Sequence, residues 1–269
     1  MKLSIITINR NNASGLKKTI ESVVSQSFKN FEYIVIDGAS TDESVDIIKS
    51  YSDKMSYWVS EPDTGIYNAM NKGIKLAKGE YTLMLNSGDY LVNDKVIQNI
   101  IPFLDDIDIV QGNTVIICSG KDKILKGYGK SDISFCEVYK GKFLHQATFA
   151  KKELFTKYGY FDENYKIGGD TVFFLKSLGF GNATFKYVNV NIAYFDTQGI
   201  SANQSEFWNE QRRKEDEMYD QLLSPRLLKL CKEDSHKIEI YDTICKNTFT
   251  RKLFYLLLNL SKWKINDSE

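Results

Sequence analysis

The chain has 269 residues, of which 42% are hydrophobic and 26% are charged, a composition typical of a globular protein with a sizeable core. Its formal net charge is zero, which argues against broad electrostatic capture of nucleic acid. The four cysteines form no CxxC pair and are too few for a disulfide framework, and no uninterrupted apolar run reaches the length that spans a bilayer. We therefore expect a cytoplasmic protein with reduced thiols and no zinc site.

Strands and helices are expected to alternate over the first hundred residues. Three apolar runs have the character of buried strands, at residues 3–8, 31–36 and 81–85, and a short strand is expected at residues 57–60. The helices between them are expected to begin near Ser14, at Thr41 or Asp42, and near Gly65. This βαβαβαβ order predicts an α/β fold with a mostly parallel sheet flanked by helices.

The alternation weakens after Leu104. Short strands are expected at residues 107–111, 113–118, 123–126, 185–188 and 192–195. Residues 127–142 have the composition of a loop. Helices are expected at residues 151–158 and 171–178.

The composition changes near residue 205, where a highly charged helical segment begins. Residues 205–223, 227–232 and 238–260 are expected to be helical, so we place a main domain at 1–204 and a helical extension at 205–269. Residues 251–264 carry four basic side chains, no acids and an apolar centre. Such a helix can lie in a membrane interface, or it can dock on the protein core or on another subunit of a homo-oligomer.

Acidic residues follow two of the predicted strands. Asp37 comes after the strand at 31–36, and Asp89 closes the turn that follows the strand at 81–85. Ligands bind at the carboxyl ends of strands in open α/β sheets, so the two aspartates together favour a polar small-molecule site. Either residue alone could be an ordinary turn aspartate.

The helix that begins near Gly65 offers further polar groups. Backbone N–H groups at its start suit an anion or a base edge, and Asn68, Asn71 and Lys72 lie on the same helix. The alternative is an ordinary helix with a solvated face.

Five motifs come in a fixed order along the chain. They are Ile5–Asn11, Ser22–Phe28, Phe31–Asp42, Glu61–Gly73 and Leu85–Asp89. This ordered set resembles the inverting glycosyltransferase family two, which has the GT-A fold, and its branch that makes bacterial surface polysaccharides. The resemblance is strong over residues 1–115, the expected nucleotide-sugar-binding half, and looser over 143–202, within the expected acceptor half at 116–204.

The resemblance implies roles for individual residues on the donor side. Thr7, Asn9 and Arg10 would lie near the nucleotide, Asp37 would hydrogen-bond the base or ribose, and Asp63 would hydrogen-bond the base. Asn68 and Lys72 would add donor contacts from the following helix.

Asp89 matches the last acid of the family's DxD motif. By resemblance it would hold Mn²⁺ or Mg²⁺ against the donor diphosphate. Ser87 occupies the place of the first acid, so the ion would arrive with the sugar nucleotide, or Ser87 would act through water. A single carboxylate is chemically consistent with such a site, because magnesium sites commonly use one or two carboxylates together with phosphates and water.

The second half of the chain supplies the candidates for the acceptor side. Asp170 precedes an apolar helix and could be its N-cap, whereas the resemblance makes it the base that deprotonates the acceptor hydroxyl; the two roles are compatible. By resemblance, His145 would contact the acceptor or donor sugar. Asp196 would position the diphosphate or acceptor, or it could be a turn residue.

We therefore expect an inverting glycosyltransferase that moves a sugar from a nucleotide-diphosphate donor, with UDP the family's commonest choice, to a hydroxyl of a glycan or lipid-linked acceptor. It would act in bacterial polysaccharide biosynthesis, in the cytoplasm or peripherally on the inner face of the cell membrane. One alternative is a non-catalytic sugar-nucleotide-binding or scaffold protein. A sugar nucleotidyltransferase is disfavoured, because the loop after the first strand contains a single glycine, Gly15.

Overall fold

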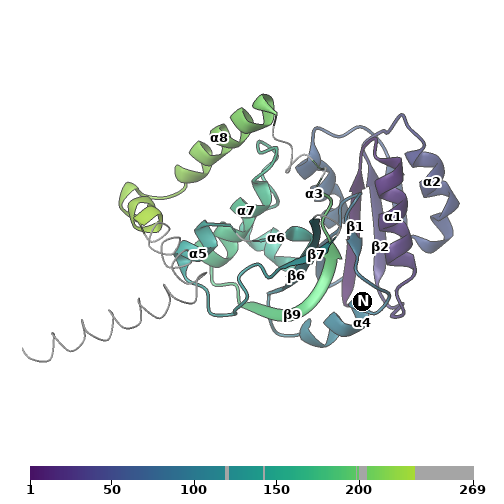
Figure 1. Cartoon of the computed structure of the whole chain (residues 1–269), viewed down its shortest axis with the longest axis horizontal. Coiled ribbons are helices and arrows are strands. Elements are labelled where there is room, and N and C mark those ends of the chain that lie inside the picture. The colour runs from purple at the N-terminus through teal and green to yellow at the C-terminus, as the bar shows by residue number, and fades with distance from the viewer. Residues whose placement is uncertain (119–120, 142, 198, 200–204, 234–269) are drawn as a thin grey trace, which may run out of the picture. The chain divides into compact units, whose positions relative to one another are not determined.

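The computed structural model describes residues 1–118, 121–141, 143–197, 199 and 205–233 (Figure 1). It divides into two compact units, Met1–Asp220 and Gln221–Glu269, and in the second unit residues 225–233 are helical. The expected helix at 238–260 and the basic apolar segment at 251–264 lie outside the described residues.

The first half of the sheet is parallel, as expected. Its strands are β1 (Leu3–Asn9), β2 (Glu32–Asp37), β3 (Tyr57–Ser60) and β4 (Tyr81–Met84). They lie in the order β3-β2-β1-β4 and are connected by α1 (Ala13–Val24), α2 (Ser44–Ser50) and α3 (Ile66–Leu76). Every residue of β1, β2 and β4 is buried, and since successive side chains point to opposite faces, both faces of this sheet are covered.

The helix starts differ slightly from the prediction. Asn12, not Ser14, is the N-cap of α1, and its side chain accepts a hydrogen bond from the Gly15 amide. The first residue of α2 is Ser44, whose amide donates to the Asp42 carboxylate. Both corrections are local, because a neighbouring polar side chain provides the capping oxygen.

The second half of the sheet is mixed. Its strands are β5 (Tyr90–Leu91), β6 (Ile109–Cys118), β7 (Lys121–Leu125), β8 (Thr148–Lys151) and β9 (Phe185–Tyr194). The sheet continues as β4-β8-β6-β9-β5, and β7 pairs with β6 as a hairpin. Antiparallel β8 joins the two halves, while β6 and β9 run parallel.

Each of the two long strands was expected as two short ones. β6 passes through Gly112, where an added Cβ would collide with Ile192 and the Val190 carbonyl of β9. Gly112 is therefore a site of close strand approach and not a turn. β8 was not predicted, because its apolar run is only a few residues long.

The remaining helices cover the second half. They are α4 (Val96–Ile100), α5 (Phe135–Tyr139), α6 (Glu153–Tyr158), α7 (Gly169–Phe174) and α8 (Glu206–Asp220). The expectation of a loop over 127–142 is wrong for α5, which is stabilised by a capping box between Ser134 and Glu137. α8, which the sequence placed in the C-terminal extension, packs within the Met1–Asp220 unit.

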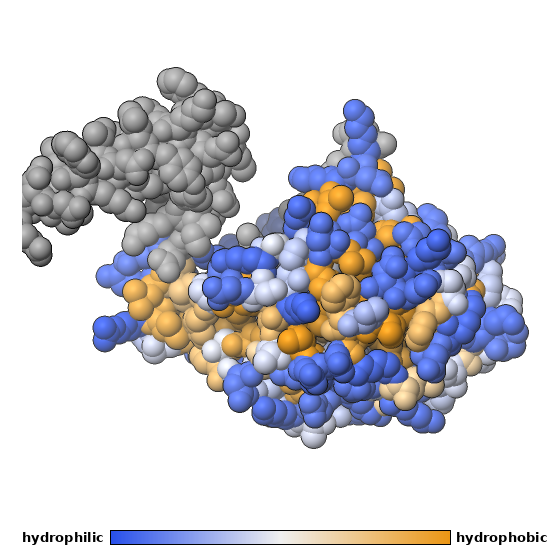
Figure 2. Space-filling model, turned by 90° about the horizontal axis from the view of Figure 1, so that it is seen from below, coloured by the Kyte–Doolittle hydropathy of each residue, from blue (hydrophilic) through white to orange (hydrophobic). Residues whose placement is uncertain are grey.

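The core lies on both sides of the central strands. Its largest fully buried side chains include Tyr33, Tyr81 and Phe149, and the hydroxyl of Tyr81 lies 2.5 Å from the carbonyl oxygens of both Asp105 and Ile107. Hydrophilic residues cover much of the surface seen in Figure 2, with apolar patches between them.

In the part of the chain that the structure describes, no helix is both long enough and apolar enough to cross a membrane.

Candidate functional site

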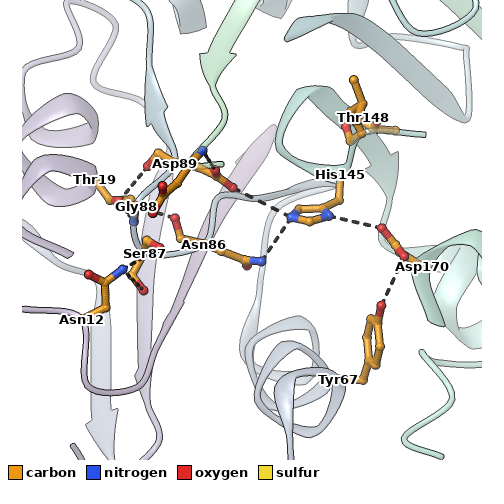
Figure 3. A network of polar contacts seen from close by, with 12 residues as sticks. Asn12, Thr19, Tyr67, Asn86, Ser87, Gly88, Asp89, His145, Thr148 and Asp170 are labelled. Carbon is orange, nitrogen blue, oxygen red and sulfur yellow. Dashed lines mark hydrogen bonds and ion pairs between the residues drawn. The ribbon is translucent and has the colours of Figure 1, made fainter. Parts of the chain in front are cut away.

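The polar turn after β4 is fixed by α1. The Thr19 hydroxyl accepts a hydrogen bond from the Gly88 amide at 3.0 Å and donates to the Asp89 carbonyl at 2.6 Å. Gly88 has φ of +104°, a backbone conformation that favours glycine. Because Thr19 and Gly88 define the turn, Asp89 is directed into the protein (Figure 3).

Asp89 is almost completely enclosed. Its Oδ1 accepts a hydrogen bond from the Asp196 amide at 2.8 Å, and its Oδ2 lies 3.9 Å from Nε2 of His145. Burial raises the pKa of Asp89 to about 6, and the nearby His145 and the Asp196 amide only partly oppose this effect.

His145 lies between Asp89 and Asp170 (Figure 3). It begins the short 3₁₀ turn His145–Ala147 before β8, and its Nδ1 is 3.2 Å from Oδ2 of Asp170. Its Nε2 is 3.1 Å from Nδ2 of Asn86; since that amide nitrogen can only donate, the neutral ring carries its proton on Nδ1. Burial opposes protonation, but the hydrogen bond and charge of Asp170, with the charge of Asp89, raise the pKa of His145 above its usual value.

Asp170 is held by donors on both of its oxygens. His145 contacts Oδ2, while Oδ1 accepts from the Tyr67 hydroxyl at 3.2 Å and from the Thr171 amide at 3.0 Å. Burial, followed by the charge of Asp170, raises the pKa of Tyr67 well above its usual value, so Tyr67 remains a donor. Asp170 lies in the first turn of α7 but is not its N-cap, because that position is Gly168.

The predicted donor side centres on Asp37, which is fully buried. Its carboxylate accepts four hydrogen bonds, from Asn9 Nδ2, from the Ser40 amide and hydroxyl, and from the Ser60 hydroxyl. Burial tends to raise the pKa of Asp37, but the hydrogen bonds of Ser40, Ser60 and Asn9 outweigh it and lower the pKa. Asp37 thus ties together the ends of β1, β2 and β3.

Asp63 and Arg10 lie beside this group. Nη1 of Arg10 is 3.9 Å from Oδ1 of Asp63, which also accepts from the Gly65 amide at 3.0 Å. A Cβ added to Gly38 would collide with Asp63 Oδ2, so the glycine allows this carboxylate to approach the strand end. The Arg10 side chain is 64% exposed, which leaves its guanidinium accessible to a bound anion.

Two predicted residues face elsewhere. Thr7 is fully buried in β1, where its hydroxyl accepts from the Tyr33 hydroxyl at 3.2 Å. Ser87 contacts Asn12, whose Nδ2 is 3.1 Å from the Ser87 carbonyl and 3.5 Å from its hydroxyl. Figure 3 shows Ser87 and Asn12 on the side of the turn away from His145.

Asn68 and Lys72, the two α3 residues that were expected to contact the donor, contact neighbouring loops. Asn68 Nδ2 donates to Glu163 at 2.9 Å. Lys72 pairs with Glu61 at 2.7 Å and donates to the carbonyl of Pro62 at 2.9 Å. Both side chains therefore have structural partners within the chain.

Asp196 joins the Asp89 side of the site. A Cβ on Gly88 would lie 2.5 Å from Oδ2 of Asp196, so this carboxylate occupies the space that a side chain at position 88 would fill. Among the described residues, no group of three or more His, Cys, Asp or Glu side chains could hold a metal ion. Any cation here would therefore depend on the Asp89 and Asp196 carboxylates and on ligand oxygens.

Sequence reasoning did not assign a site role to Tyr67, Thr19 or Glu215. Tyr67 stands within the motif Glu61–Gly73, so the resemblance was the only signal that could have found it. Glu215 lies in a charged helix and carries no local signal; its contacts are described below.

Comparison with known proteins identifies the family of this chain. The family model described as Glycosyl transferase family 2 matches residues 4–173, more than half of the chain. An uncharacterised glycosyltransferase of Mycobacterium tuberculosis is 32% identical over 208 residues, covering 75% of this chain and 77% of the relative. A "PGL/p-HBAD biosynthesis glycosyltransferase" of Mycobacterium bovis is 26% identical over 206 residues, covering 74% of this chain and 78% of the relative.

Solved structures share the fold. The S. aureus TarS 1-349 structure in complex with UDP-GlcNAc has a TM-score of 0.65 and 22% identity, and the match covers 79% of this chain and 65% of that one. A mannosyltransferase of Pyrobaculum calidifontis in complex with GDP-Man and Mn²⁺ has a TM-score of 0.58 and 16% identity, and the match covers 78% of this chain and 60% of that one. The chain therefore spans under two thirds of each of these solved chains. The expected GT-A fold is confirmed, and the chain belongs to glycosyl transferase family 2.

Proposed function

We propose that this protein is an inverting glycosyltransferase that moves a sugar from a UDP-sugar donor to a hydroxyl group of a glycan or lipid-linked acceptor. The observation that carries the proposal is the buried link from Asp89 through His145 to Asp170. It joins Asp89, which is expected beside the donor diphosphate, to Asp170, which is the proposed base for the acceptor hydroxyl.

Asp170 is the proposed base. The acceptor oxygen forms a bond to the anomeric carbon as the bond from that carbon to the diphosphate oxygen breaks, and the hydroxyl proton passes to Asp170. Donors from Tyr67, Thr171 and His145 orient the carboxylate before this transfer. The displacement proceeds on the face opposite the leaving diphosphate, so the anomeric configuration inverts.

Two features support a nucleotide-diphosphate donor. Among the structural neighbours, TarS is in complex with UDP-GlcNAc and the mannosyltransferase is in complex with GDP-Man. In this chain, the exposed guanidinium of Arg10 is a positively charged group that lies beside the Asp63 carboxylate, whose oxygens can accept hydrogen bonds. We propose that Asp63 and Arg10 contact the nucleotide, while Asp37 acts indirectly by holding the strand ends.

A divalent cation fits the donor set beside Gly88. Asp89 and Asp196 supply two carboxylates, and hard cations such as Mg²⁺ are commonly bound by one or two carboxylates plus substrate phosphates. We propose that these two residues hold Mn²⁺ or Mg²⁺ together with the donor diphosphate. When bound, the ion would stabilise the negative charge on the departing diphosphate.

The acceptor and location remain part of the proposal. The M. bovis relative is named for PGL/p-HBAD biosynthesis, and we propose a glycan or lipid-linked acceptor in bacterial polysaccharide biosynthesis. A lipid-linked acceptor would bring the protein to the inner face of the cell membrane, and we propose that residues 251–264 then contribute to membrane binding.

Calorimetric titration of the full chain with UDP, GDP and CMP, each with and without Mn²⁺, tests the donor class. We expect metal-dependent binding of UDP, and metal-dependent UDP release when a matching UDP-sugar is added, with water or a glycan extract as acceptor. Binding without release from any UDP-sugar would favour the scaffold alternative. Absence of nucleotide binding by the folded protein would overturn the proposal.

A further inference from the structure

A buried carboxylate from α8 holds the loop that leads to Asp170. Glu215 is 4% exposed and accepts hydrogen bonds from three consecutive backbone amides, those of Lys166, Ile167 and Gly168. The distances are 3.0 Å to the Ile167 amide and 2.8 Å to the Gly168 amide, and Gln211 Nε2 adds a donor at 2.9 Å.

Three successive N–H groups that converge on one point form a concave anion-binding nest. In most loops such amides face water, whereas here the anion is a side chain of the same protein. Burying a carboxylate is costly unless its oxygens are hydrogen-bonded, and Glu215 satisfies this requirement only while the loop keeps its conformation. The interaction therefore couples the position of α8 to the shape of the loop.

The opposite side of the loop is held by α3. The Tyr67 hydroxyl lies within hydrogen-bond distance of both the Ile167 carbonyl and Asp170 Oδ1, which share its one proton, and a Cβ on Gly169 would lie 2.8 Å from the Tyr67 ring. The backbone amide of Ile167 is therefore bound by α8, and its carbonyl is bound by α3. Because Asp170 is only three residues further along the chain, the position of its carboxylate depends on both helices.

α8 has a second attachment that fixes its place. The rings of Tyr139 and Tyr219 stack at 5.2 Å, the Tyr219 hydroxyl donates to the Tyr139 carbonyl at 3.0 Å, and the Tyr139 hydroxyl donates to Asp220. Loss of Glu215 would therefore release the loop while α8 stays anchored on α5.

We propose that Glu215 is a positioning residue for Asp170, which makes α8 a functional part of the catalytic unit. Glu215 lies on α8, beyond residues 4–173, the part that the family model matches. The inference rests on the proposed function, because its kinetic consequence requires Asp170 to be the base.

The test compares Glu215→Gln with Glu210→Gln on the same helix. Glu210 is a matched control, since its half-exposed carboxylate contacts Lys214 at 2.8 Å. The glutamine at 215 keeps the shape but places an NH₂ group against backbone amides, which are also donors. We expect Glu215→Gln to lower kcat for UDP release by about 10- to 100-fold, the scale that sub-ångström to ångström misplacement causes. The KM for the donor and the Kd for UDP should change less than about threefold, and Glu210→Gln should match wild type.

Two further measurements separate positioning from loss of folding. Hydrogen–deuterium exchange should accelerate in the peptide that contains residues 165–170 and not in β4, with a melting temperature close to wild type. Acetate, which can enter the vacated nest, should restore part of kcat to Glu215→Ala and have no effect on Glu210→Ala.

Unchanged kcat in Glu215→Gln, or equal losses of kcat, UDP affinity and thermal stability, would overturn the inference. Absence of UDP release from the wild type would overturn the proposed function instead. In that case the exchange rates of residues 165–170 would still decide whether Glu215 holds the loop.

Discussion

Nδ1 of His145 lies 3.2 Å from Oδ2 of Asp170, although the two residues belong to different elements. The contact gives the Asp170 carboxylate a donor that keeps it oriented, and Nε2 of the same ring faces Asp89. A single imidazole therefore contacts an acid on each side of the proposed reaction.

Asp170→Asn should reduce turnover by at least about 100-fold, because an amide cannot accept the acceptor proton. UDP affinity, measured by calorimetry, should stay within a few fold of wild type. Glu153→Gln is a suitable control, since Glu153 is an exposed acid in the first turn of the neighbouring helix α6. Full activity in Asp170→Asn would exclude this residue as the base.

His145→Phe should lower kcat by about 10-fold or more, a usual effect of removing a group that orients a reactive residue. The ring volume is nearly kept, but both nitrogen contacts, to Asp170 and to Asn86, are lost. Asn86→Ala removes only the contact at Nε2 and should cost less. Steady-state UDP-release kinetics would rank the kcat values of the two variants. A larger loss of kcat in Asn86→Ala than in His145→Phe would contradict the role given to Nδ1.

Gly88→Ala should weaken Mn²⁺-dependent UDP binding by about 10-fold, because its methyl group would displace the Asp196 carboxylate. Asp196→Asn should have a similar effect. Gly159→Ala is the matched control: Gly159 also has positive φ, of +93°, but a Cβ there meets nothing within 4 Å. Calorimetry with and without EDTA measures the difference, and equal binding by the Gly88 and Gly159 variants would remove Asp196 from the cation site.

The apolar runs predicted the first four strands, of which β1, β2 and β4 are fully buried and β3 is partly exposed. They also predicted that Asp37 and Asp89 follow strand ends. They did not reveal that the Asp37 carboxylate accepts hydrogen bonds from the Ser40 and Ser60 hydroxyls, since the Ser60 contact depends on how β2 and β3 pair. Sequence periodicity places an acid at a sheet edge but does not tell whether it faces a ligand or its own chain.

The second half was less predictable for a physical reason. β8 is four residues long, so it carries too few periods of its pattern to stand out. The helix expected at 171–178 is present, as α7 followed by the π-helix Leu175–Phe180, although it begins two residues earlier than predicted. The contacts that build the site join residues far apart in the chain, such as Asp89 with Asp196. No local pattern encodes such contacts, and only the resemblance placed Asp170 and His145 near the same site.

Asp37→Asn should lower the free energy of unfolding by about 3 kcal/mol at pH 7, because it loses charged hydrogen bonds and turns an NH₂ group toward other donors. The folded-state pKa of Asp37 is lowered from the unfolded value near 3.9, so the ionised carboxylate stabilises the fold fully above about pH 4. This contribution is lost as the pH falls through the folded pKa. Urea unfolding at pH 7 and pH 3 should therefore show the gap between wild type and variant narrowing in acid. Asp46→Asn, at an exposed side chain, should show no such gap, and a gap that widens in acid would contradict the assignment.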